Sequence, residues 1–488
     1  MPDWTIAIWE FVRAPLSATP WAAGRDFWLG EVLDDRFVVA YFLPLAPLLL
    51  LVPRRHLRLG LIVTGLGFLA YLCGVPYAGL WLLTCLAFHR LAERFARECQ
   101  RPDVLKLGPP LAAGVLIGGW YLATLLLHHA TLPAGWNAWL YDHARWMFPL
   151  GARNLSWEPL FPQLHDRPAA EPPFPLLHAL FWNVHNIGTA YLAVRLFHYF
   201  FELKRGTIPA ERRSLLNFLA YTCYAPALIQ GPLERFPRFQ DEIDTCHTRR
   251  GWHNLPPAFA RIAYGVAKSL IATWYFRPLL RNVYGVGGDE TFWRHPEQIQ
   301  SFALLYLGGF VMVWWLYLEF SGYCDISAGI ARLLGYRQVE NFRRPYLATN
   351  MRDLWRRWHI SLSEILRDYL YIPFGGNRRH VTLNLCATFV LCGLWHALTP
   401  RVAVWGLLIG LCVGLNHHWT QWLKRLDATP ASRWAAIRRA WLRLQPLPRL
   451  CAWLLTQHAF VIPLLFFFGG TGALNVVREI LRRIASAL

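Results

Sequence analysis

The chain has 488 residues, of which 55% are apolar and only 16% are charged. This composition excludes a disordered chain, and it argues against a single soluble domain because one soluble core rarely hides so much apolar surface. It predicts a polytopic membrane protein. The formal charge is +19, but the basic residues lie in clusters between apolar runs, so we expect no nucleic-acid partner.

Apolar runs of spanning or near-spanning length recur along the whole chain. In order, they occupy residues 37–52, 59–78, 76–89, 111–128, 176–201, 214–231, 259–276, 302–320, 381–398, 402–415 and 451–470. A helix needs about 20 residues to cross a bilayer. We therefore predict an all-α membrane protein with about 10–12 transmembrane helices, together with re-entrant and interfacial helices.

The charges of the connecting segments predict the orientation. Residues 1–36 carry six acidic and three basic side chains, so this N-terminal segment should lie outside the cytoplasm. Residues 129–175 are aromatic and slightly acidic, which predicts an external interfacial segment. Residues 337–380 hold nine arginines among many apolar residues, which predicts a cytoplasmic or re-entrant segment. We expect one transmembrane domain from residue 37 to residue 488, without a signal peptide before it.

One histidine lies in this arginine-rich segment. If residues 350–371 form a continuous helix, one face carries Trp355, His359, Leu362, Leu366 and Tyr369, so His359 points with the apolar stripe. Two interpretations stay open: a core histidine that donates a hydrogen bond to a backbone carbonyl, or a catalytic group.

A second histidine lies in an apolar run without any charged residue. An ionisable group inside a span is a functional candidate. If the helix starts near His380, the rise of 1.5 Å per residue places His396 about 24 Å along it. A neutral imidazole there suits a general base, because burial disfavours its charged form. The alternative is a hydrogen bond between helices near Trp395.

Other candidate sites are weaker. Asp325 follows a predicted span, where it is either functional or the cap of the next helix. The sequence has neither a nucleophile elbow nor a phosphate-binding loop. The ten scattered cysteines form no C-x-x-C pair, and adjacent histidines point apart on a helix, so we expect no metal site.

The core of the sequence, residues 319–405, resembles the membrane-bound O-acyltransferase family. The motifs that carry the resemblance are EFSGYCD at 319–325, NFRRPY at 341–346, WRRWHISLS at 355–363, LRDYLYIP at 366–373, GGNR at 375–378 and GLWH at 393–396. The run YIPFGGNRR at 371–379 looks like the alginate O-acetylation branch. The runs GPLERFPRF at 231–239 and ATNMRDLWRRWH at 348–359 look like the teichoic-acid D-alanylation branch. Three residues depart from the family pattern: Glu319, Glu364 and Ala397.

The resemblance implies a fold around a central tunnel, in a multi-pass protein of the bacterial inner membrane, and the charges of residues 1–36 predict that its N-terminus is external. It implies that His396 is catalytic and that His359 orients the donor or polarises its carbonyl. Further donor-binding candidates are Trp355, Arg356, Arg367, Asp368, Tyr369, Asn377 and Asp325. No metal and no permanently bound cofactor is expected.

The implied activity moves a small acyl group, such as acetyl or D-alanyl, from a cytoplasmic thioester to a hydroxyl of an envelope polysaccharide or glycolipid. The donor would be acyl-CoA or an acylated phosphopantetheine carrier protein. The outer partner would be the envelope glycan or a periplasmic acyl-relay protein, and membrane lipid surrounds the chain. Two alternatives remain: a lysophospholipid or lipid O-acyltransferase, and a non-catalytic acyl-group channel.

Overall fold

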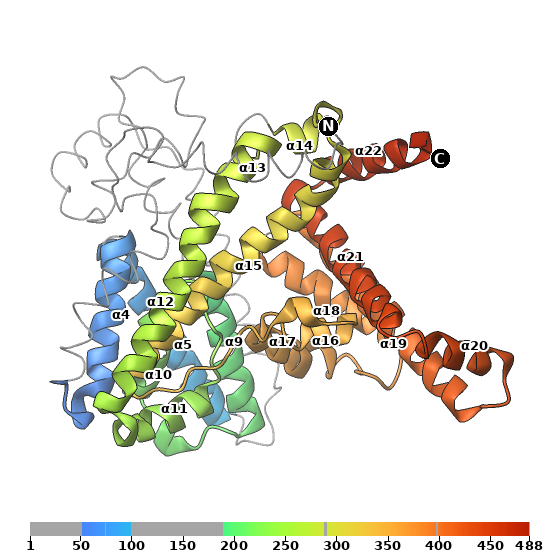
Figure 1. Cartoon of the computed structure of the whole chain (residues 1–488). Coiled ribbons are helices and arrows are strands. Elements are labelled where there is room, and N and C mark those ends of the chain that lie inside the picture. Colours follow the sequence, from blue (N-terminus) through green and yellow to red (C-terminus); the bar gives the residue numbers. More distant parts are fainter. Residues whose placement is uncertain (1–50, 74, 99–188, 287–289, 397–398, 488) are drawn as a thin grey trace, which may run out of the picture. The chain divides into compact units, whose positions relative to one another are not determined.

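The part of the chain that the structure describes is helical, and none of its residues lies in a strand (Figure 1). The computed structural model describes residues 51–73, 75–98, 189–286, 290–396 and 399–487. The predicted all-α class is confirmed. Four expectations lie outside the described residues, wholly or almost so: the segments 1–36 and 129–175 and the runs 37–52 and 111–128.

Sixteen α-helices are described, together with two π-helical turns, Ala272–Phe276 and Arg367–Tyr371. The helices are α4 Leu57–Cys73, α5 Val75–Glu98, α9 Thr189–Arg205, α10 Leu215–Thr222, α11 Phe236–Thr245, α12 Leu255–Ile271, α13 Arg277–Tyr284, α14 Thr291–Arg294, α15 Phe302–Leu333, α16 Met351–Trp355, α17 Ile360–Leu366, α18 Val381–His396, α19 Pro400–Ala428, α20 Arg433–Leu442, α21 Leu447–Gly469 and α22 Gly472–Ala487.

Three of the described helices are long and apolar enough to cross a membrane, namely α15, α19 and α21. The helix α18 is also apolar but has only 16 residues. All four contain runs that the sequence predicts as spans. The expected total of 10–12 spans concerns the whole chain and stays a prediction.

The predicted span at 214–231 is wrong. The helix α10 ends at Thr222, because Pro226 has no N–H and its ring would clash with the carbonyl four residues earlier. The buried guanidinium of Arg195 donates instead to the carbonyl oxygens of Tyr221 and Thr222, at 3.1 and 3.3 Å, and to that of Ala227 at 2.5 Å. One arginine from α9 thus satisfies carbonyls that the end of α10 leaves without a helical partner.

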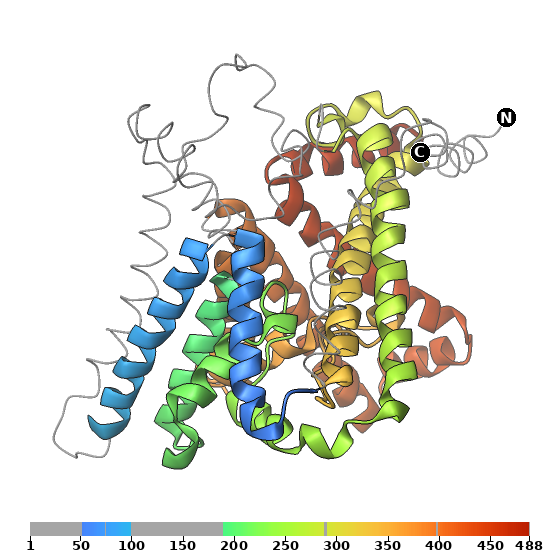
Figure 2. The same ribbon diagram turned by 90° about the vertical axis from the view of Figure 1, so that its left-hand side faces the viewer.

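The described part of the chain divides into two compact units, with boundaries inside α12, inside α15 and between residues 339 and 340. Of the described residues, those up to 266 and those in 323–339 form the N-terminal unit, and those in 267–322 and from 340 onward form the C-terminal unit. In the N-terminal unit, α4 and α5, blue in Figure 2, pack against each other and against α10. Its core is aromatic, with fully buried side chains such as Phe68, Trp81 and Phe218.

In the C-terminal unit, α18 and α19 form a tightly packed helical hairpin, and α21 packs against α19. Two glycines of α19 allow this close approach. A Cβ on Gly406 would collide with the carbonyl oxygen of Phe389, and one on Gly410 would lie 2.5 Å from the Cα of Cys386. The hairpin therefore depends on the absence of side chains at these positions.

We expect Gly406→Ala to lower the free energy of unfolding by about 1–3 kcal/mol, because the added methyl group must push the two helices apart. The matched control is Gly79→Ala on α5, where an added Cβ meets no atom within 4 Å. The control should be neutral or more stable by up to about 1 kcal/mol, since alanine favours the helix. Thermal unfolding of the purified protein in detergent measures both changes. Equal losses in the two variants would contradict the packing argument.

Candidate active site

The segment predicted as one helix, 350–371, is interrupted at His359. Its backbone has φ 43° and ψ 54°, in the left-handed region, and it separates α16 from α17. The expected stack of Trp355, His359, Leu362 and Tyr369 on one helical face is therefore wrong. The last part of the segment is π-helical rather than α-helical.

Hydrogen bonds to a distant residue, Asn341, hold this break open. The backbone N–H of Ile360 donates to the Asn341 carbonyl at 2.9 Å. The N–H and the hydroxyl of Ser361 both donate to Asn341 Oδ1, at 3.2 and 2.6 Å. Asn341 is itself buried. These bonds replace the helical ones that would join α16 to α17, so the chain turns at His359 instead of continuing as a helix.

The side chain of His359 is only 5% exposed, and neither of its ring nitrogens has a hydrogen-bond partner among the described residues. Its ring stands edge-on to Phe320, with the centroids 4.8 Å apart. Burial, and to a smaller extent the positive charge that His396 would carry, lower the pKa of His359 to about 3. The imidazole is therefore neutral at physiological pH. The backbone-bonded core histidine that the sequence left open is not what the described residues show.

His396 is the last residue of α18, which begins at Val381 as the sequence predicts. Its side chain is exposed and carries aromatic neighbours on several sides. The ring of Phe467 lies perpendicular to it at 5.4 Å, and the ring of Trp405 lies at 5.8 Å. No described residue hydrogen-bonds the imidazole, so the alternative of a hydrogen bond between helices finds no partner in this part of the chain.

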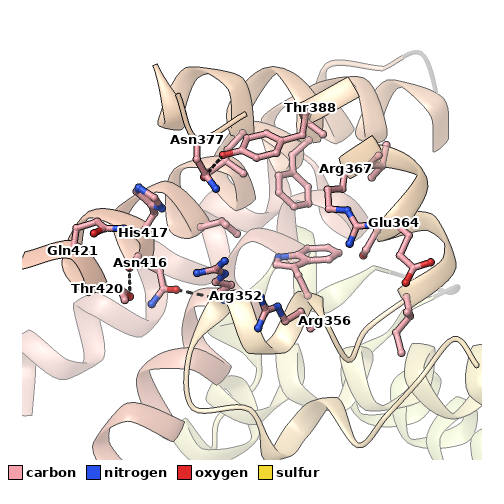
Figure 3. A pocket seen from close by; sticks show the side chains of 18 residues that line it. Arg352, Arg356, Glu364, Arg367, Asn377, Thr388, Asn416, His417, Thr420 and Gln421 are labelled. Carbon is pink, nitrogen blue, oxygen red and sulfur yellow. Dashed lines mark hydrogen bonds between the residues drawn. The ribbon is translucent and has the colours of Figure 1, made fainter. Parts of the chain in front are cut away.

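A pocket of about 330 Å³ lies in the C-terminal unit between α16, α17, α18 and α19 (Figure 3). Its charged lining consists of three arginines, Arg352, Arg356 and Arg367, against one carboxylate, Glu364. Figure 3 shows Arg367 and Glu364 on one side of the pocket and the polar residues of α19 on the other. The pocket thus carries a net positive charge on a lining that is otherwise largely apolar.

Four of the predicted donor-binding residues line this pocket: Trp355, Arg356, Arg367 and Asn377. The indole N–H of Trp355 has no hydrogen-bond partner among the described residues. The amide oxygen of Asn377 accepts a hydrogen bond from the Tyr371 hydroxyl at 2.8 Å.

The other predicted residues do not line the pocket. Asp368 pairs with Arg367 through two hydrogen bonds, at 2.7 and 3.1 Å, and so fixes a lining guanidinium. Tyr369 is buried. His359 is not a lining residue either, although Ile360, which follows it, is one.

Asp325 belongs to the N-terminal unit, whereas the pocket belongs to the C-terminal unit. The expectation that it caps a new helix after a span is wrong, because α15 continues to Leu333. Asp325 is buried there and pairs with Arg261 of α12 at 2.5 Å. The ion pair neutralises a carboxylate that the apolar helix would otherwise bury alone.

The part of the site that α19 contributes was not predicted from the sequence. Asn416, His417, Thr420 and Gln421 line the pocket, and Asn416 Oδ1 accepts from the backbone N–H of Arg352 at 3.4 Å. The predicted span ended at residue 415, whereas the helix continues to Ala428. The available signal was the i, i+4 spacing of Asn416 and Thr420, which places two polar side chains on one helical face.

Fold and site together define a helical membrane protein with a buried histidine, His359, beside an arginine-lined pocket and a second histidine, His396, at the end of an apolar helix. The sequence model of MBOAT, the membrane-bound O-acyltransferase family, matches residues 174–457, more than half of the chain. The chain therefore belongs to this family.

Relatives with named activities are similar over part of the chain. The protein named "probable alginate O-acetylase AlgI" of Azotobacter vinelandii is 30% identical over 293 residues, which is 59% of this chain and 52% of that protein. A peptidoglycan O-acetyltransferase of Helicobacter pylori is 29% identical over 53% of this chain and 45% of its own length. A teichoic acid D-alanyltransferase of Bacillus subtilis is 26% identical over 51% of this chain and 64% of its own length. The chain spans about half the length of the first two.

Proposed function

We propose that this protein is a membrane O-acyltransferase that moves a small acyl group from a cytoplasmic thioester to a hydroxyl of a cell-envelope polysaccharide or glycolipid. The observation that carries the proposal is the pair of histidines in a member of this family. His359 is buried, neutral and without a hydrogen-bond partner among the described residues, and His396 ends an apolar helix among aromatic rings. The named relatives, which act on alginate, peptidoglycan or teichoic acid, support an envelope acceptor.

In the proposed reaction His396 is the general base. It takes the proton of the acceptor hydroxyl while that oxygen attacks the thioester carbonyl carbon. The electron pair of the carbonyl moves to its oxygen, and His359 donates a hydrogen bond to the resulting oxyanion. When the intermediate collapses, the C–S bond breaks and the thiolate takes the proton back from His396. The products are an ester and a free thiol.

The arginine-lined pocket suits the anionic end of the donor. Its volume of about 330 Å³ is that of a small-ligand site, and its three arginines against one glutamate favour phosphate oxygens. Both acyl-CoA and an acylated phosphopantetheine carrier protein present phosphate next to a thioester. The donor is thus proposed to enter from the cytoplasmic side, where the arginine-rich segment is expected by its charge.

The acceptor hydroxyl is proposed to reach His396 from the outer side of the membrane. An envelope glycan, or a periplasmic acyl-relay protein, would offer its hydroxyl from the outer side of the inner membrane. The acyl group would pass between the two sides through the expected central tunnel. In this orientation the N-terminus of the chain lies outside the cytoplasm, as the charges of residues 1–36 predict.

The two histidines should be required for transfer and not for binding the donor. We expect His396→Ala and His359→Ala each to lower kcat by at least about 100-fold, because removal of a general base or of an oxyanion donor costs about that much. Acyl transfer from a radiolabelled thioester to an envelope acceptor, by protein in proteoliposomes, measures kcat. The control is His253→Ala, which changes an exposed histidine of the N-terminal unit. Wild-type transfer by a correctly inserted His396→Ala protein would contradict the proposal.

The pocket arginines should act on the affinity for the donor. We expect Arg352→Gln combined with Arg356→Gln to raise the KM for acyl-CoA or the acylated carrier by about 10-fold or more, because each lost charge-assisted hydrogen bond costs about 1.5–3 kcal/mol. The change in kcat should be small.

The matched control for the pocket variant is Arg378→Gln combined with Arg379→Gln. These exposed arginines belong to the same segment but do not line the pocket. An equal rise in KM for both pairs would show that the overall charge of the segment, and not the pocket, binds the donor.

A further inference from the structure

The helix α20, Arg433–Leu442, connects two candidate membrane spans. It follows α19, which ends at Ala428, and it precedes α21, which begins at Leu447 (Figure 1). A short connection between consecutive spans must emerge at a membrane surface, because each span ends there. The position of α20 in the chain therefore places it at the boundary between lipid and water.

One face of α20 is apolar and exposed. Trp434, Ile437 and Trp441 follow each other at spacings of three and four residues, which places them on one side of the helix. Their exposed fractions are 54%, 50% and 40%. The apolar surface continues beyond the helix with the exposed Leu444 and Leu447. On the protein-facing side, Ala435 is buried. Exposure of such an apolar face to water is energetically unfavourable, and tryptophan is typical of the membrane interface.

The residues on both sides of α20, together with the helix itself, are strongly basic. Residues 424–449 contain seven arginines and lysines and a single acidic residue, Asp427. Asp427 pairs with Arg438, and the guanidinium of Arg433 lies 5.6 Å from the centre of the Trp434 ring. Arg443 and Arg449 have no acidic partner among the described residues. An exposed tryptophan face with arginines around it is the pattern of a helix that lies in an anionic membrane surface.

We propose that α20 and its flanking residues form a binding site for anionic phospholipids of the cytoplasmic leaflet. The apolar face enters the boundary between headgroups and acyl chains, and Arg433, Arg443 and Arg449 bind the lipid phosphates. The inference does not depend on the proposed acyl transfer.

The site has a consequence for the pocket. The pocket residues Thr420 and Gln421 lie on the same helix, α19, two turns before its end at Ala428. A lipid-bound connector therefore holds the end of the helix that forms one wall of the pocket. Anionic lipid should order this wall even when no donor is bound.

Hydrogen–deuterium exchange of the full-length protein in nanodiscs tests the proposal. The probe is phosphatidylglycerol, titrated into phosphatidylcholine discs, and the readout is the exchange of backbone amides in residues 433–444. We expect phosphatidylglycerol to slow this exchange. Removing Arg433, Arg443 and Arg449 as Arg→Gln should weaken the apparent affinity for phosphatidylglycerol by about fivefold for each arginine. The corresponding Arg→Lys variant keeps the charges and should keep the response.

The matched control removes three exposed arginines of α5 as Arg90→Gln, Arg94→Gln and Arg97→Gln. This variant should respond to phosphatidylglycerol as the wild type does. Identical exchange of α20 with and without phosphatidylglycerol in the wild type would overturn the proposal. A full response in the variant without Arg433, Arg443 and Arg449 would overturn it as well. Protection of α20 by an added acidic acyl carrier protein, but not by phosphatidylglycerol, would assign this surface to a protein partner instead.

Discussion

The hydrogen bonds of Asn341 are the constraint on which the site depends. They fix a left-handed residue at His359 and divide what would otherwise be one helix into α16 and α17. The division has two effects. It directs the side chain of His359 into a buried position against Phe320. It also allows both α16 and α17 to contribute residues to the arginine-lined pocket. One buried amide side chain therefore links the geometry of the histidine to that of the proposed donor site.

The close packing of α18 on α19 supplies the second half of the site. Glycines at the interface bring the two helices together, so that His396 at the end of α18 lies beside Trp405 of α19. Further along, α19 reaches the pocket with its polar residues and then the basic connection around α20. The hairpin of α18 and α19 thus carries the proposed general base and part of the proposed donor pocket. Its second helix leads directly to α20, the proposed lipid-binding helix.

Much of this arrangement was predictable from the sequence. The apolar runs of the sequence correctly located four helices, α15, α18, α19 and α21. Four motif residues line one pocket, as predicted for donor-binding residues: Trp355, Arg356, Arg367 and Asn377. Periodicity failed where a tertiary contact overrides local preference. Asn341 breaks the helix at His359 from 18 positions away, and no pattern within 350–371 reveals that bond. The end of α10 at Thr222, in contrast, was signalled by Pro226. The contribution of α19 to the pocket was not predicted, because the apolar run used to locate the helix ends at residue 415. The helix itself continues through polar residues to Ala428.

In the proposed reaction, His396 and His359 catalyse the transfer of an acyl group to an envelope hydroxyl. Mass spectrometry of envelope glycans and lipids, from a deletion strain complemented with either the wild-type or the His396→Ala protein, tests it most directly. We expect one ester on an envelope glycan to be lost on deletion, restored by the wild type and not restored by the variant. Full restoration by the His396→Ala protein, or loss of an ester from phospholipids alone, would contradict it.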